Sequence, residues 1–138
     1  MLGSFGSNEA LARAVAIGVP SFVRRARAVE EAMAQLESRI QLERNRMRKA
    51  LGPLPAGPPA TWRPAERRRL ARSDERWRNF LERVPLGDVH AAQEAYNKFY
   101  AIEREMALPG APRIAVPPLQ LLDRAELIAR FAPLVRPE

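Results

Sequence analysis

The chain has 138 residues, 46% of them hydrophobic, so it is long enough for one folded domain and too apolar to be fully disordered. It contains no cysteine, which excludes disulfide bonds, thiolate metal sites and cysteine nucleophiles and favours a reducing compartment, the cytoplasm. The net charge of +7 favours an anionic partner. No stretch of about 18 apolar residues is present, so we expect no membrane partner.

The first predicted element is a short helix over residues 8–17, with Asn8 as its N-cap. A long helix is predicted over residues 21–51, and the pair Gly52 and Pro53 is a typical helix end. Its candidate core positions alternate steps of four and three, with one polar interruption: Phe22, Ala26, Val29, Met33, Leu36, Ile40, Glu43, Met47 and Ala50. This is the heptad spacing of a coiled coil, so we expect a seam that packs either within the chain or between copies.

A Pro-rich linker is predicted over residues 52–63, which hold four prolines and two glycines. The next helix is predicted over residues 64–84, with Pro64 at its first position. Its apolar stripe comprises Leu70, Ser73, Trp77, Phe80, Leu81 and Val84. A third helix is predicted over residues 88–108, with Asp88 as N-cap. Its stripe comprises Val89, Ala92, Tyr96, Phe99, Glu103 and Met106.

The C-terminal part has the form of a docking segment. Residues 109–122 are predicted to be an extended arm, and residues 123–132 a short amphipathic helix capped by Asp123. Such elements bind grooves on other chains. The residues expected to dock on a partner are Leu119, Leu122, Leu127, Ile128 and Phe131. The alternative is that this segment folds back over its own helices.

These elements predict an all-α fold in a single helical domain of residues 1–138. We expect a three-helix bundle or long helical hairpin with coiled-coil seams, short extra helices at both ends and the Pro-rich linker. The sequence shows no alternating strand pattern and no internal repeat.

The positive charge is concentrated in the first part of the chain. Residues 1–84 hold 17 basic and nine acidic residues, a net +8, whereas residues 85–138 hold six and seven, a net −1. Arg69, Arg76 and Arg83 recur every seven residues beside the predicted seam. The candidate nucleic-acid contacts are Arg44, Arg46, Arg48, Lys49, Arg67, Arg68, Arg69, Arg72, Arg76 and Arg83. Alternatively, these cations pair with glutamates three or four positions away and only solvate the helices.

No constellation for catalysis is found in the sequence. His90 is the only histidine, and no cysteine accompanies it, so a metal site is not expected. Glu43 and Glu103 each stand alone on a predicted seam, without the further ligands of a carboxylate metal centre. We therefore expect no enzyme activity, no cofactor and no small-molecule substrate.

Two functions fit these observations. The first is a non-enzymatic basic subunit of a larger nucleoprotein assembly, whose arginine-rich helix faces contact DNA or RNA backbone without reading sequence. The second is a protein-interaction or scaffold module that binds other protein subunits, or a second copy, through the coiled-coil helix and the C-terminal arm.

Overall fold

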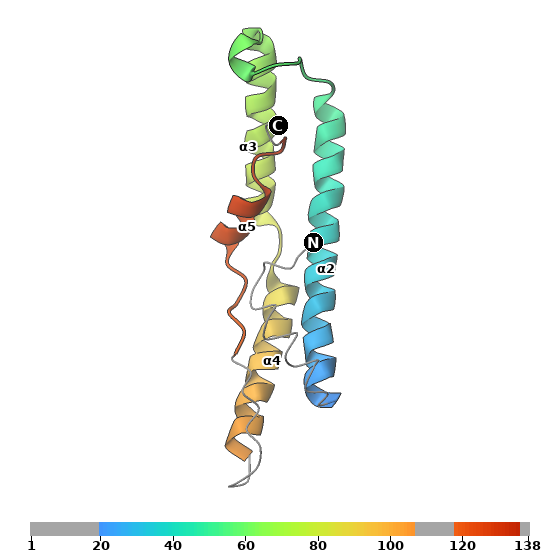
Figure 1. Ribbon diagram of the computed structural model, residues 1–138, viewed down its shortest axis with the longest axis vertical. Coiled ribbons are helices and arrows are strands. Elements are labelled where there is room, and N and C mark those ends of the chain that lie inside the picture. Colours follow the sequence, from blue (N-terminus) through green and yellow to red (C-terminus); the bar gives the residue numbers. More distant parts are fainter. Residues whose placement is uncertain (1–19, 107–117, 136–138) are drawn as a thin grey trace. The chain divides into compact units, whose positions relative to one another are not determined.

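The computed structural model describes residues 20–106 and 118–135, and in these residues the regular elements are helices, without a strand (Figure 1). The elements in chain order are α2 (Pro20–Leu51), the 3₁₀ turn η1 (Pro59–Thr61), α3 (Pro64–Arg83), α4 (Gly87–Met106) and α5 (Arg124–Phe131). The all-α class expected from the sequence therefore describes these residues. The helix expected over 8–17 and the part of the arm over 109–117 lie outside them.

Local sequence signals set the helix ends. α3 begins at Pro64, and the Glu66 carboxylate accepts a hydrogen bond from the Arg63 backbone N–H at 3.4 Å. After α2, Gly52 has a φ of +78°, a left-handed conformation that glycine adopts without steric cost. Asp123 caps α5 as expected, since its carboxylate accepts from the Ala125 N–H at 3.1 Å.

The chain forms two compact units, each assembled from two separate stretches of sequence. Unit 1 comprises residues up to 37 together with 85–122, and unit 2 comprises residues 38–84 together with 123 onward. Helix α2 supplies its first part to unit 1 and its second part to unit 2. Neither unit is a continuous sequence domain, and the single-domain organisation expected from the length stays a prediction.

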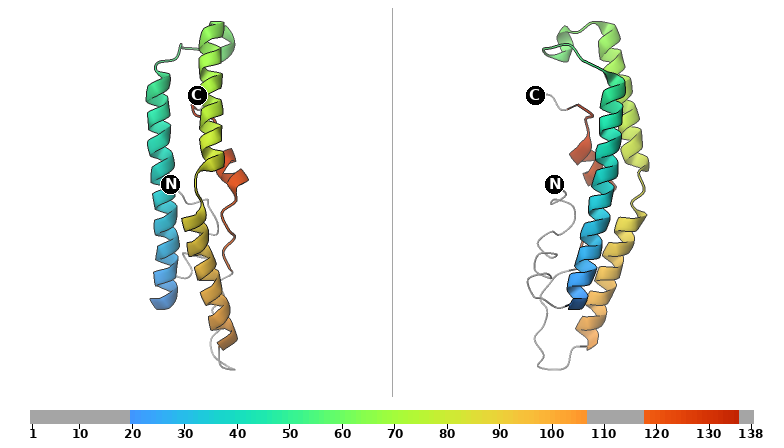
Figure 2. Two further views of the ribbon diagram at one scale, coloured as in Figure 1. Left: turned by 180° about the vertical axis from the view of Figure 1, so that it is seen from behind. Right: turned by 90° about the vertical axis from the view of Figure 1, so that its right-hand side faces the viewer.

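In unit 1 the first part of α2 lies beside α4, as the views in Figures 1 and 2 agree. The Arg25 guanidinium stacks over the Phe99 ring, 4.5 Å from its centre, and joins the two helices. The buried apolar side chains of this unit are Ala26, Val29, Met33, Leu36, Leu86, Val89, Tyr96, Leu119 and Leu122. Gln93 is also buried, although it is polar. The sequence predicts the adjacent Ala92, and not Gln93, on the apolar stripe.

Three polar side chains of α4 hold the backbone of residues 119–122. Asn97 donates to the Leu119 carbonyl at 2.8 Å and accepts from the Leu119 N–H at 2.7 Å. Gln93 donates to the Gln120 carbonyl at 3.2 Å and accepts from the Leu122 N–H at 2.9 Å. The His90 ring Nε2 lies 2.8 Å from the Leu122 carbonyl oxygen. We call His90, Gln93 and Asn97 the main-chain clamp.

In unit 2 the second part of α2, α3 and α5 surround a core that is centred on Trp77. The buried apolar side chains are Ile40, Leu51, Trp77, Leu81, Val84, Leu127, Phe131 and Leu134. The Trp77 indole N–H donates to the Phe131 carbonyl at 3.0 Å, at the end of α5. Arg124 donates to the Leu81 and Val84 carbonyls at 2.7 and 2.9 Å, which satisfies acceptors at the end of α3.

The buried face of α2 follows the predicted core positions from Ala26 to Ile40 and then departs from the heptad spacing. From Ala26 to Ile40 the predicted positions are buried, but Ala50 is exposed, and Arg44 is buried beside the half-buried Glu43. An α-helix has 3.6 residues per turn, so its buried face drifts from a strict heptad unless the helices supercoil. A step of four from Ile40 therefore puts Arg44 inside, and Leu51 replaces Ala50 in the core.

Candidate nucleic-acid interface

Four arginines of α3 lie on one exposed face of the helix. They are Arg68, Arg72, Arg76 and Arg83, and we call them the arginine face. At 3.6 residues per turn they fall within an arc of about 80° and span about 22 Å along the helix axis. Trp77 and Leu81 occupy the opposite, buried side. The burial of these two residues in unit 2 therefore holds the four guanidinium groups toward solvent.

Acidic side chains border the arginine face but do not lie within it. Glu75 and Glu82 fall just outside its arc, and the arc itself includes exposed Asn79 and no acidic residue. Within the described ranges none of the four arginines makes a hydrogen bond or an ion pair. The alternative in which Arg72 pairs with Glu75 is therefore not what the structure has.

Arg67 and Arg69 bind the linker that precedes α3. Arg67 donates to the Ala60 carbonyl at 3.3 Å, and Arg69 donates to the Pro53 carbonyl at 2.9 Å. Both side chains are exposed, so they remain accessible while they brace the linker. The sequence places Arg69 in one row with Arg76 and Arg83. Of these three, Arg69 binds the backbone of the linker.

Arg44 is not available to a nucleic acid, which corrects its expected role. Only 7% of this residue is exposed, and its guanidinium lies over the rings of Trp77 and Phe131, 5.4 and 5.5 Å from their centres. The same group donates a hydrogen bond to the Phe131 carbonyl. Arg44 is therefore part of the core of unit 2, where the aromatic faces and the carbonyl replace water around the charge.

The other cations at the end of α2 are all exposed but differ in their contacts. Arg48 is exposed and donates to the Leu134 carbonyl at 3.1 Å. Arg46 forms an ion pair with Glu43 at 3.1 Å, with 70% of its side chain exposed. Lys49 is exposed and makes no such contact among the described residues. This end of α2 therefore adds Lys49, and the partly neutralised Arg46, to the positive surface of unit 2.

The residues expected to dock on a partner are packed against this chain itself. Leu119 and Leu122 are buried in unit 1, and Leu127 and Phe131 are buried in unit 2. Ile128 is half-buried. The alternative of a segment folded back over its own helices therefore describes the structure. The sequence analysis missed the side chains that hold the segment, although the polar residues at 90, 93 and 97, spaced three and four apart beside the apolar stripe, were a signal for them.

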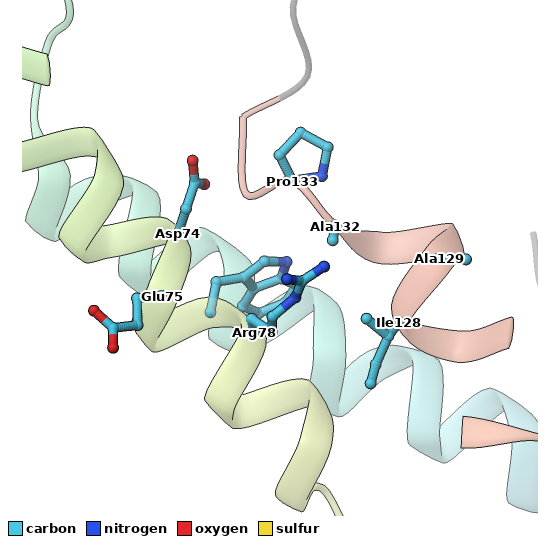
Figure 3. A pocket seen from close by; sticks show the side chains of 8 residues that line it. Asp74, Glu75, Arg78, Ile128, Ala129, Ala132 and Pro133 are labelled. Atoms are coloured by element: carbon cyan, nitrogen blue, oxygen red, sulfur yellow. The ribbon is translucent and has the colours of Figure 1, made fainter. Parts of the chain in front are cut away.

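A groove of about 580 Å³ lies between α3 and α5 (Figure 3). Its lining comprises Asp74, Glu75, Trp77, Arg78, Ile128, Ala129, Ala132 and Pro133. The Asp74 carboxylate accepts from the Leu134 N–H at 3.2 Å, so it helps to hold the chain after α5. Among the described residues no three acidic or histidine side chains gather as metal ligands. The eight lining residues include no nucleophile beside a base.

None of the known protein families, curated proteins or solved structures that were compared with this chain matches it. In the described ranges, every helix is too short or too polar to cross a membrane.

Proposed function

We propose that the protein binds the phosphate backbone of a nucleic acid through the arginine face of α3, as a non-enzymatic subunit of a larger nucleoprotein assembly. The observation that carries this proposal is the exposure of four arginines in one arc, without an acidic neighbour in that arc or an internal partner among the described residues. An arginine guanidinium binds phosphate oxygens in a bidentate manner and stays charged at any physiological pH.

The spacing of the arginine face suits a repeating anion. Arg68, Arg72 and Arg76 are separated by steps of about 6 Å along the helix, and Arg83 follows about 10 Å further on. A nucleic-acid backbone offers negative charges at comparable intervals on both sides of a groove, which is about 12 Å wide in the major groove of DNA. Contacts of this kind fix position and carry no sequence information, so we propose binding without sequence readout.

The finer architecture expected from the sequence belongs to the same proposal. A three-helix bundle with coiled-coil seams would keep α3 helical and its arginines on the outer side. The net charge of +8 over residues 1–84 adds a long-range attraction to the local contacts.

The test is a titration of the full chain against fluorescently labelled DNA and RNA of about 20 nucleotides, followed by anisotropy at several salt concentrations. Removing one phosphate contact lowers the slope of log K against log salt by about 0.9 for duplex DNA. Replacing Arg68, Arg72, Arg76 and Arg83 by alanine should therefore lower the slope by about 3 to 4, and affinity by tenfold or more at about 0.1 M salt.

A matched control separates the arginine face from net charge. Arg24, Arg27, Arg39 and Arg78 are also exposed, and replacing these four by alanine removes the same charge, from +7 to +3. The control variant should keep most of the salt slope. An equal drop in slope for both variants, or no binding by the original chain at low salt, would contradict the proposal. If another protein subunit binds both variants as well as it binds the original chain, this result would instead favour the protein-interaction alternative.

A further inference from the structure

Trp62 lies in an ordered loop just before α3 and is only half-buried. The loop, residues 57–62, contains the turn η1, which buries none of its residues. Gly57 turns the chain at a φ of +88°, and the Trp62 indole N–H donates to the Gly57 carbonyl at 3.2 Å. The Trp62 backbone N–H donates to the Pro59 carbonyl at 3.1 Å. The loop therefore fixes one edge of the indole ring, although this ring belongs to neither core.

The faces of the Trp62 ring differ from those of other half-buried aromatic rings. Phe80 stacks on Trp77, with 5.4 Å between the ring centres, and Phe99 lies under the Arg25 guanidinium. The Trp62 ring has no such contact with an aromatic or cationic group of another described residue. A tryptophan that is held in place and partly exposed, without a ring of its own chain to stack on, suits stacking against a flat ligand.

The loop lies beside the first residue of the arginine face, Arg68. Figure 1 shows η1 at the N-terminal end of α3, and Arg67 ties the loop to this helix by donating to the Ala60 carbonyl at 3.3 Å. Arg68 follows Pro64 by about 6 Å along the helix, and the two residues from Trp62 to Pro64 span at most about 7 Å. The Trp62 backbone is therefore within about 13 Å of the Arg68 backbone. A strand whose phosphates follow the arginine face can thus bring a base to the ring.

The acidic border of the arginine face limits how many backbones it can hold. Glu75 and Glu82 are exposed and, on the helix surface, lie between the arginine face and Arg78. A helix in the groove of a duplex has a phosphate backbone on each of its two flanks. On one flank of α3 these two carboxylates would repel the phosphates, so the charges favour a single backbone.

We propose that the ligand of the arginine face is a single-stranded nucleic acid, with an unpaired base stacked on Trp62. This inference rests on the proposed function, because it needs the arginine face to hold the phosphates. In a duplex the bases already stack on one another, whereas a single strand offers open base faces. Every base has such a face, so stacking on Trp62 agrees with binding without sequence readout.

The fluorescence of the full chain tests the proposal, because its two tryptophans differ in exposure. Trp77 is fully buried, so a base can stack only on Trp62. The ligands are an oligothymidine of about 20 nucleotides, which does not pair with itself, and a DNA duplex of the same length. We expect the single strand to bind more tightly at equal salt and to quench the fluorescence, which the duplex leaves nearly unchanged. Equal or tighter binding of the duplex, or binding of the single strand without quenching, would overturn the inference.

Two variants of Trp62 separate stacking from the structure of the loop. Trp62→Leu removes the flat ring and should lower single-strand affinity by roughly 5- to 150-fold. It removes no phosphate contact, so the slope of log K against log salt should stay that of the original chain. Trp62→Phe also loses the hydrogen bond to Gly57 but keeps a flat ring, so most of the affinity should remain. An equal loss in both variants would assign the effect to the loop and overturn the inference.

The failure of this inference is distinguishable from the failure of the proposed function. If the original chain and Trp62→Leu bind the single strand equally, with the same salt slope, the inference is wrong and the proposed function stands. If the original chain binds neither nucleic acid at low salt, the proposed function is wrong, and the assignment of Trp62 is wrong with it.

Discussion

The two compact units hold the two parts of the C-terminal segment with different chemistry. In unit 1 the donors and acceptors are neutral amides and one histidine, whereas in unit 2 they include the guanidinium groups of Arg44, Arg48 and Arg124. Part of the basic surplus of this chain therefore holds the chain's own backbone. Arginines without such contacts, above all those of the arginine face, are therefore the strongest candidates to bind phosphate.

The strongest test of the difference between these two kinds of arginine is to remove Arg44, which is buried. Arg44→Ala should lower the free energy of unfolding by roughly 2 to 4 kcal/mol, because it leaves a cavity between two aromatic rings and removes a charged hydrogen bond. Arg68→Ala, on the arginine face, should change it by less than about 0.5 kcal/mol. Urea denaturation of both variants measures the difference. Equal effects would mean that Arg44 has no structural role beyond that of a surface cation.

The corresponding test in unit 1 removes one amide of the clamp. Asn97→Leu keeps the branching and the number of side-chain heavy atoms but leaves the Leu119 N–H and C=O without their partners, so the free energy of unfolding should fall by about 1 to 3 kcal/mol. Asn79→Leu is the control, because Asn79 is an exposed asparagine on α3 without a hydrogen bond from its side chain to another described residue. A destabilisation by Asn97→Leu no larger than that of the control would show that the clamp adds nothing to folding.

Local signals in the sequence predicted the helices well, because each signal and its effect lie within a few residues. Pro64 begins α3, Gly52 follows α2, and Asp123 caps α5. The stripe with Trp77 and Leu81 was also predicted from periodicity, whereas the sequence left open whether neighbouring helices cover the arginines.

The inward position of Arg44 could not be predicted in the same way. Its carbonyl partner, Phe131, lies 87 residues away, and the choice between Glu43 and Arg44 depends on how far the helix face drifts from a heptad. The clamp has the same limit, since Gln93 and Asn97 bind backbone 22 to 29 residues further on. Contacts between side chains and distant backbone leave no periodic trace, so composition alone assigns such residues to the surface.

The smallest expected effects separate two arginines that the sequence placed in one row. Arg69→Ala removes an exposed hydrogen bond to Pro53 and should lower the free energy of unfolding by about 0.5 kcal/mol. Arg76→Ala should leave stability unchanged and lower the salt slope of nucleic-acid binding by about 0.9. If both residues contact phosphate equally, the slope will fall by the same amount in the two variants, and the binding surface will extend beyond the arc of the arginine face to Arg69. If the slope falls only for Arg76→Ala, the arc of the arginine face, rather than the sequence spacing of seven, defines the binding surface.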